Sequence, residues 1–355
     1  MKKTILTFLI AAAFLASGLF AYRMYFNSQN ISASTESADA LWSESADIEF
    51  DVDSTQDIAD EYPWLNGVAE SVTIDDEDVA LKHPVTVYLA VGTDGSGNEN
   101  GIGDDYLGDL ADFLALLVID TVDRKYSIIE INRNTMTDVP LMDYYGNSDD
   151  TGYMQICMAH AYGSNREMGC RNVCDAVSAL FGGLEIDGYI SVSMEYIQTI
   201  NNAAGGVTVT IEDDFSNEDS SLVMGEEVTL SDEQAVHYLR GRMNVGDGTN
   251  ECRMRRQRTY LKAMSKKLTS KGDDVEYLSD FFTTIKDVSV SNISLEDMIL
   301  TCESIQDYTD MGIYSISGEN EEQDSFGDGV ILAEFYPYAD SINEVLEEVL
   351  PLEEH

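Results

Sequence analysis

The chain has 355 residues, of which 44% are apolar, and a formal net charge of -46. The apolar fraction is enough for a folded core and excludes a disordered acidic polymer. The charge argues against a nucleic-acid partner, because a polyanion would be repelled by most of the surface.

An apolar segment opens the chain. Lys2 and Lys3 precede an uncharged run from Ile5 to Tyr22, whose length is close to the ~20 residues that span a bilayer. Positive charge before the run places the N-terminus in the cytoplasm. A cleaved signal peptide is the alternative, with weak small-residue sites near Ser17 and Ala21. We favour a retained anchor, and therefore a single-pass protein of the cell membrane whose C-terminal domain is extracellular.

This interpretation divides the chain into four parts. Residues 1–3 are a cytoplasmic N-terminus, 4–22 a transmembrane signal-anchor, 23–83 an acidic extracellular stalk, and 84–350 a folded domain with its core in 84–268. The stalk is Ser-rich and acidic, and no Lys or Arg occurs between Arg23 and Lys82.

Strand and helix patterns then alternate along the chain. Apolar runs predict strands at 85–91, 113–120, 126–131, 189–193, 207–211, 313–317 and 330–335. Helical patterns occupy 155–162, 170–181, 194–203, 232–239, 251–268, 294–305 and 338–350. Ser231 and Gln234 form a capping box for one helix, and Asn250 is a suitable N-cap for the next. The alternation predicts an α/β/α sandwich with a mixed central sheet.

Basic residues gather in one segment of this acidic chain. Six of its twenty Lys and Arg residues lie between Arg240 and Arg258. Arg240 and Arg242 share a face if that segment is extended, and Arg253, Arg256 and Gln257 share one helical face. The short loop between them can bring the two faces together into a site for an anion. Guanidinium groups suit phosphate and carboxylate oxygens.

The alternative for these arginines is pairing with the abundant surface acids. Pairing with surface acids explains a single arginine well, but it explains less well why several arginines are spaced to share one face. Arg255 and Arg258 point away from the shared face of the helix, and we expect both to be solvated.

Two aspartates stand at the ends of predicted strands. Asp94 ends one strand and Asp112 begins the next, so neighbouring strands would place both at one rim of the sheet. Carboxylate oxygens there suit Mg²⁺, with Mn²⁺ as an alternative. Arg133, just after a strand, would add a guanidinium at the same rim. The alternatives are that Asp94 shapes a turn, Asp112 caps one and Arg133 forms a salt bridge at a hairpin end.

Cysteines and histidines give no further site. The five cysteines are too few and too scattered for a disulfide framework. Cys170 and Cys174 lie one helical turn apart, and we expect them to pack within a helix. The four histidines show no zinc-ligand spacing.

Several short motifs occur in a diagnostic order. They are GTD (92–94), AD (111–112), INRNTMTDVP (131–140), MAHAYG (158–163), LEIDGYISVS (184–193), GGVTVTI (205–211), LSDEQAVHYLRGRM (230–243) and RMRRQR (253–258). Together they resemble the LytR-CpsA-Psr family of cell-envelope proteins, over roughly residues 84–268 and more weakly to about 350.

The resemblance implies a specific function. Family members are phosphotransferases that attach anionic glycopolymers, such as teichoic acid or capsule, to peptidoglycan. The donor is a polyprenyl-pyrophosphate-linked glycan, whose prenyl chain lies in an apolar tunnel inside the α/β/α domain. By this resemblance Asp94 and Asp112 hold Mg²⁺, and Arg133 joins the catalytic arginines. The residues matching the pyrophosphate-binding set are Arg240, Arg242, Arg253 and Gln257; the spacing of the helix adds Arg256.

The chain departs from the family pattern around these residues. Leu110 stands where the family has Arg, Asn134 and Asn250 where it has Asp, and Gln155 and Cys157 where it has Lys and Asn. Losing one positioned acid or base commonly costs about 10²–10⁴-fold in rate. Asp247, in the same loop as Asn250, is a substitute base. The alternative function is therefore a catalytically weak protein that holds polyprenyl-linked glycan or regulates envelope assembly.

Overall fold

The computed structural model describes residues 69–95, 108–271, 274–294, 308–323 and 331–353, together with residues 297, 301 and 305. The predicted anchor at 4–22, residues 23–68 of the predicted stalk and most of the predicted helix at 294–305 lie outside these residues. Within the described ranges, no helix combines the length and the apolar character needed to cross a bilayer.

A mixed sheet forms the centre of the fold, as predicted. Its strands lie in the order β10 (Ser289–Ser291), β7 (Gly188–Ser193), β2 (Glu77–Thr93), β3 (Ala111–Asp120), β4 (Lys125–Ile131) and β11 (Thr309–Ser315), and β1 (Ala69–Ile74) also pairs with β2. The β2–β7 and β4–β11 pairs are parallel, and the other pairs are antiparallel. β3 and β4 form an antiparallel hairpin.

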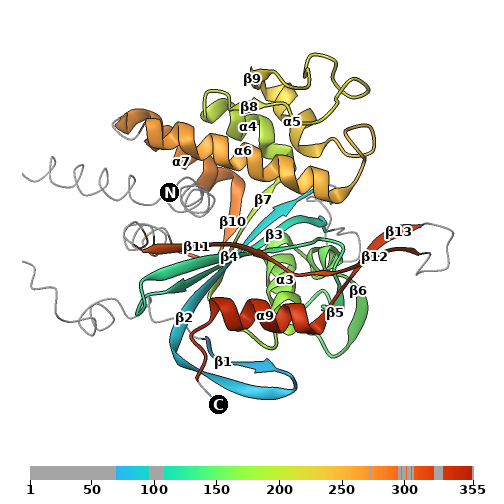
Figure 1. Ribbon diagram of the computed structural model, residues 1–355, viewed down its shortest axis with the longest axis vertical. Helices are drawn as coiled ribbons and strands as arrows, with labels where there is room; N and C mark the ends of the chain where they lie inside the picture. The colour runs from blue at the N-terminus through green and yellow to red at the C-terminus, as the bar shows by residue number, and fades with distance from the viewer. Residues whose placement is uncertain are drawn as a thin grey trace, which may run out of the picture.

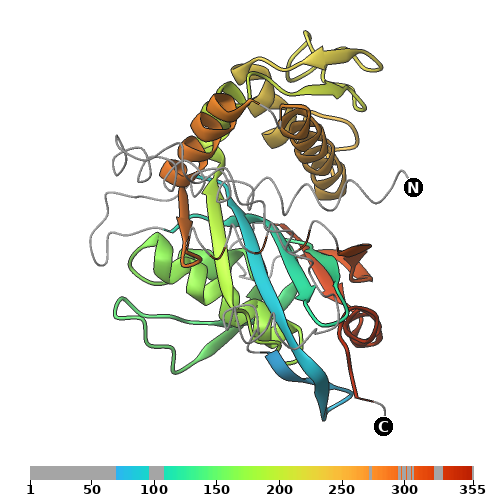
Figure 2. The same ribbon diagram turned by 90° about the vertical axis from the view of Figure 1, so that its left-hand side faces the viewer.

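Helices cover both faces of this sheet (Figures 1 and 2). Leu114, Leu116 and Val118 of β3 belong to a core shared with α3 (Arg166–Leu180) and α9 (Ala339–Val349). The alternate residues Ala115 and Leu117 face the other side, where α6 (Asn250–Ser270) contributes Leu261. This two-sided burial confirms the α/β/α sandwich and explains why β3 is apolar throughout.

A second core lies on the α6 side of the sheet. It joins α6 to α4 (Ile197–Ala203), α5 (Asp232–Arg240) and α7 (Val275–Val288), all in the upper part of Figure 1. Ser231 and Gln234 cap α5 reciprocally, which confirms the predicted capping box. The predicted strand at 207–211 is β8 (Thr208–Thr210), which pairs with β9 (Glu227–Thr229) and not with the central sheet.

Two further hairpins lie beside the sheet. One pairs β5 (Met136–Pro140) with β6 (Thr151–Gln155), and the other pairs β12 (Gly318–Gln323) with β13 (Leu332–Pro337). The segment predicted as a helix at 155–162 is the 3₁₀ helix η3 (Ile156–Ala161), and η4 (Met194–Tyr196) precedes α4.

The folded domain begins earlier than predicted. β1 and the first half of β2 precede residue 84, and Val72, Val79 and Leu81 are buried in the main core. Their apolar side chains alternate with exposed acidic and polar ones, which is the pattern of a strand with one buried face. Because this stretch is rich in acidic residues, its strand pattern was not predicted. The stalk therefore cannot extend to residue 83.

Candidate active site

A buried carboxylate lies between two guanidinium groups at one end of β3. One oxygen of Asp112 accepts a hydrogen bond from Arg133 Nη1, and the other accepts from Arg253 Nη1 at 2.8 Å. The Asp112 side chain is 4% exposed, Arg133 14% and Arg253 6%. Arg133 follows β4 and Arg253 lies in the first turns of α6, so the fold joins residues far apart in the sequence.

Arg240 and Arg242 complete the cluster. Arg240 Nη2 donates to the backbone oxygen of Asp94 at 3.2 Å, and the charge of Arg242 acts on Arg253. The segment is not extended as predicted, because Arg240 is the last residue of α5 and Gly241 caps that helix. The arginines converge because the chain turns at Gly241, between the end of α5 and the start of α6.

The cluster contains more positive than negative charge. Burial lowers the pKa of Arg253; Asp112 opposes this effect, while Arg133 and Arg242 add to it. Among the described residues, the buried Nε atoms of Arg133 and Arg242 have no hydrogen-bond partner. Buried donors are normally satisfied. Unused donors beside excess positive charge are typical of a site that binds an anion.

Asp94 and Asp112 lie at the same rim of the sheet, as predicted. Asp94 follows β2, its N–H donates to Leu110 O at 3.0 Å, and its Oδ1 accepts from Leu110 N at 2.9 Å. Carboxylate oxygens are hard ligands, and each oxygen can accept more than one partner, so this pair fits Mg²⁺ in kind.

A second set of charges supports this rim and was not predicted. Asp109, 1% exposed, accepts from Thr93 Oγ1 at 3.2 Å and pairs with Arg166 Nε at 3.0 Å. Arg166 is the first residue of α3 and also pairs with Glu195. No spacing in the sequence links these positions.

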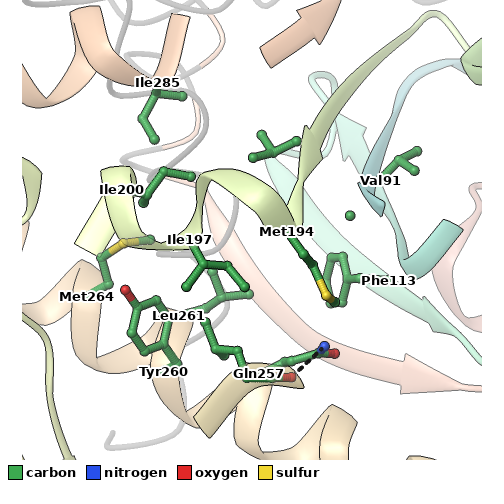
Figure 3. A pocket seen from close by; sticks show the side chains of 13 residues that line it. Val91, Phe113, Met194, Ile197, Ile200, Gln257, Tyr260, Leu261, Met264 and Ile285 are labelled. Atoms are coloured by element: carbon green, nitrogen blue, oxygen red, sulfur yellow. Dashed lines mark hydrogen bonds between the residues drawn. The ribbon is translucent and has the colours of Figure 1, made fainter. Parts of the chain in front are cut away.

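An apolar cavity of about 120 Å³ lies between the sheet and α4, α6 and α7. Arg253, Gln257, Tyr260 and Met264 recur along one face of α6, and all but Arg253 line the cavity. Figure 3 shows Gln257 among the apolar side chains. The same helical face therefore carries a cation at one end and apolar surface beyond it. The lining residues are Val91, Gly92, Phe113, Val192, Met194, Ile197, Ile200, Leu239, Gln257, Tyr260, Leu261, Met264 and Ile285.

Gln257 keeps its predicted orientation, whereas Arg256 does not. Gln257 is buried and its Nε2 donates to Leu239 O at 3.5 Å. Arg256 is fully buried, pairs with Asp213 at 2.7 Å and donates to the backbone oxygens of Tyr238 and Gly241. Assigning Arg256 to the substrate was wrong, because its guanidinium is enclosed by these partners. Positions three apart on a helix diverge by about 60°.

Arg255 and Arg258 are not simply solvated, contrary to prediction. Arg255 pairs with Asp213 at 2.5 Å, although 42% of its side chain is exposed. Arg258 pairs with Glu130, which is 4% exposed. Burial raises the pKa of Glu130, and Arg258 opposes that shift. A carboxylate on the apolar β4 attracts the nearest cation of α6.

Three of the substituted positions, Asn134, Gln155 and Cys157, lie beside Arg133. Arg133 Nη2 contacts Cys157 Sγ at 3.1 Å. Burial raises the pKa of Cys157, which Arg133 opposes. Gln155 Nε2 donates to Asn134 Oδ1 at 3.4 Å and to Ala333 O at 2.7 Å. Apart from Asp112, the groups at these three positions beside Arg133 are therefore neutral.

Asp247 is poorly suited to the role of substitute base. It is exposed, and its Oδ1 accepts from the N–H and the hydroxyl of Thr249. Hydrogen bonds from Cys252 and Thr249 lower the pKa of Asp247 to about 2. So weak a base removes few protons at neutral pH.

The predicted packing of Cys170 and Cys174 within one helix is confirmed. Cys157, Cys170, Cys174 and Cys252 are free thiols, and Cys170 and Cys174 pack within α3. Of the described residues, only His83, Asp120 and Asp123 form a group of at least three side chains that could hold a metal. The Lys125 ammonium already lies 3.5 Å from Asp120 and 3.1 Å from Asp123. We assign no metal there.

Comparison with known proteins identifies relatives of this chain. The family described as the LytR_cpsA_psr family matches residues 51–346. The polyisoprenyl-teichoic acid–peptidoglycan teichoic acid transferase TagU of Enterococcus faecalis is 24% identical over 188 residues, or 53% of this chain and 56% of that protein. TagU of Bacillus cereus is 27% identical over 201 residues, or 55% and 58%. The matches span just over half the length of these curated relatives.

Solved structures share the fold. The crystal structure of B. subtilis TagV superposes with a TM-score of 0.53 at 18% identity, covering 74% of this chain and 96% of that one. The structure of TagT bound to LIIa-WTA has a TM-score of 0.53 at 18% identity, with 78% and 99% covered.

Proposed function

Because the chain belongs to the LytR-CpsA-Psr family, we propose that it is a phosphotransferase that attaches an anionic glycopolymer to peptidoglycan. The donor is a polyprenyl-pyrophosphate-linked glycan of the teichoic acid or capsule type. One observation carries the proposal: surplus guanidinium groups surround the buried Asp112, beside an apolar cavity lined by the same face of α6. An amphipathic anion, charged at one end and apolar at the other, fits both parts.

The arginines bind and orient the pyrophosphate. Arg133 and Arg253 are held by Asp112 and supply charge to the phosphate oxygens, while Arg240 and Arg242 approach from the turn after α5. Gln257 lies between this cluster and the cavity, where the prenyl chain would lie. Fixed donors of this kind catalyse phosphoryl transfer by positioning and by stabilising charge.

In the proposed reaction, a sugar hydroxyl of peptidoglycan attacks the phosphorus attached to the glycan. A new P–O bond forms, the bond within the pyrophosphate breaks, and polyprenyl phosphate leaves. The hydroxyl proton passes to solvent or to the leaving phosphate. Mg²⁺, or Mn²⁺, held by Asp94 and Asp112, would supply further positive charge to the phosphate oxygens when bound.

We also propose that residues 4–22 anchor the protein in the cell membrane, with the folded domain outside. A lipid-linked donor stays in the membrane, so an enzyme that consumes it benefits from being held at the same surface. Labelling an engineered cysteine near residue 30 in intact cells with a membrane-impermeant reagent tests this orientation. Protection of that cysteine from the reagent would contradict it.

The test of function uses the full chain in detergent, a polyprenyl-pyrophosphate saccharide, Mg²⁺ and a peptidoglycan acceptor. Release of polyprenyl phosphate and labelling of the acceptor are measured. Replacing Arg253 by Met should lower the rate about 10²–10³-fold, the typical effect of losing one positioned charge-stabilising donor. Arg171→Met, which removes an exposed arginine of α3, is the matched control and should retain activity.

The second candidate is a binding protein on the same fold. The neutral groups beside Arg133 and the low pKa of Asp247 favour it, since no strong base lies among them. In the same assay, tight binding of the donor without release of polyprenyl phosphate would show that the protein binds the donor but does not transfer it.

A further inference from the structure

Two hairpins are joined directly beside Arg133. Thr135 forms a parallel bridge with Phe335 of β13, and Phe335 N donates to Asn134 O at 2.9 Å. Gln155, at the end of β6, donates to Ala333 O at 2.7 Å. The β5–β6 and β12–β13 hairpins therefore lie side by side (Figure 1).

Strand register places tyrosines and acids on one face of these hairpins. Residues directly opposite each other point to the same face, and the opposite pairs are Asp138 with Tyr153 and Tyr336 with Glu319. The parallel bridge puts Thr135 and Phe335 on the other face, because side chains alternate along a strand. Tyr153, Tyr336 and Tyr338 with Asp138, Glu319 and Glu334 form what we call the tyrosine face.

Carboxylates hold two of the three rings in place. Tyr336 Oη donates to Glu334 at 2.5 Å, and Tyr338 Oη donates to Glu319 at 3.0 Å. Tyr153 is 59% exposed and Tyr338 48%. Tyr338 is therefore both fixed by its hydroxyl and open to solvent, and Tyr153 adds a second exposed ring to this flat apolar surface. A ring that is already fixed loses little entropy when it binds a ligand.

The charge of this face selects its ligand. No Lys or Arg occurs between Arg133 and Arg166, and none follows Lys286, so both hairpins lack basic residues. An anionic polymer would be repelled there. An uncharged saccharide would not be repelled: its C–H surfaces pack on aromatic rings, and its hydroxyls donate to carboxylates.

We propose that the tyrosine face binds the acceptor, an uncharged glycan strand, and directs it towards Arg133. This inference rests on the proposed function, in which the anionic donor occupies the arginine cluster. The two substrates are then separated by charge: the donor lies on the basic side of Arg133, and the acceptor on the acidic side.

Binding of chitohexaose, an uncharged N-acetylglucosamine oligomer, to the full chain in detergent tests the proposal by calorimetry. Tyr153→Ala and Tyr336→Ala should each weaken binding about 3–10-fold, the effect expected for one aromatic contact, while Tyr153→Phe, which keeps the exposed ring, should keep the wild-type affinity. Tyr145→Ala is the control, because Tyr145 is 79% exposed but lies outside this face. Polygalacturonate should not bind there.

Equal weakening by Tyr145→Ala, no binding of chitohexaose, or polygalacturonate bound through Tyr153 would overturn the proposal. Binding of geranylgeranyl pyrophosphate, measured on the same variants, tests the arginine cluster separately from the tyrosine face. If that ligand binds and chitohexaose does not, only the tyrosine face is wrong. If chitohexaose binds through the tyrosines and the pyrophosphate does not bind, the proposed function is wrong.

Discussion

Two buried arginines three residues apart on α6 have opposite surroundings. Arg256 and its neighbour Arg255 meet Asp213 and Glu212, so charges balance, and backbone oxygens accept from the rest of the Arg256 guanidinium. Arg253 meets Asp112, which Arg133 already holds, with Arg242 close by. Balanced charge with satisfied donors indicates a structural role. Surplus charge around Arg253, together with the Nε donors of Arg133 and Arg242 that have no partner among the described residues, indicates a site for a ligand.

The difference also separates stability from binding. A balanced cluster stabilises the fold without a ligand. A cluster of like charges is held together by the rest of the structure and gains most when an anion arrives. Substitutions in the balanced cluster should therefore lower stability, and substitutions around Asp112 should mainly change anion binding.

The largest expected effect is on Arg256. Arg256→Met leaves Asp213 with only the part-exposed Arg255 and leaves two buried backbone oxygens without their donor. Breaking a buried pair in this manner costs about 3–5 kcal/mol of unfolding free energy. Urea unfolding of the full chain measures it, and Arg253→Met should lose less because Asp112 keeps Arg133. If both variants lose the same unfolding free energy, the two clusters do not differ in their contribution to stability.

A smaller effect is expected at Asp112, and an anion should reverse it. Asp112→Asn leaves Arg133 and Arg253 without their shared counter-charge and should cost about 3 kcal/mol, since solvent reaches part of Arg133. Adding pyrophosphate should then raise the Tm of this variant more than that of the wild type. A ligand at 100 times its Kd contributes about 2.7 kcal/mol.

Arg256→Met is the matched comparison for this rescue. The Arg256→Met variant loses a positive charge beside Asp213, so an added anion cannot compensate for the substitution. Pyrophosphate should therefore raise the Tm of this variant by no more than it raises the Tm of the wild type. If pyrophosphate leaves the Tm of Asp112→Asn unchanged, the cluster around Asp112 does not bind anions.

The sequence predicted most of the fold and the centre of the site. Apolar runs found β2, β3, β4 and β7, and the capping box found α5, because these patterns are local. The N-cap of α6 was predicted one residue too late: the Thr249 hydroxyl accepts from Cys252 N, and Asn250 is already helical. The separation of Arg253 from Arg256 was not predictable. It depends on Asp213, a residue 43 positions away from Arg256, and helical spacing alone cannot say which tertiary partner a side chain meets.

The same limit explains the support around the rim. Asp109, Arg166 and Glu130 have partners that only the packing of α3 and α6 against the sheet brings close. By contrast, Asp94 and Asp112 were placed correctly at one rim because adjacent antiparallel strands bring the end of one beside the start of the next.

The smallest predicted effect concerns pH, and it lies in neither arginine cluster. His160 is fully buried; its Nδ1–H donates to Asp109 O at 3.1 Å, and its Nε2 faces Cys170 Sγ at 3.5 Å. Burial lowers the pKa of His160; Asp109 opposes this effect, and Arg166 adds to it. In the neutral ring, both nitrogens therefore have a suitable partner. In a protonated ring, Nε2 would also carry a proton, and its N–H would face the Cys170 sulfur, which is a weak acceptor.

A lowered folded-state pKa means that the unfolded chain binds the extra proton first. The stability that His160 contributes is therefore present above its ordinary pKa of about 6.5 and is lost as the pH falls below that value. One proton changes the unfolding free energy by at most about 1.4 kcal/mol per pH unit. Unfolding of the wild type and of His160→Gln between pH 7.5 and 5 measures this slope. The variant should lose stability less steeply, because glutamine takes up no proton in this range; an unchanged slope would assign the pH dependence to other groups.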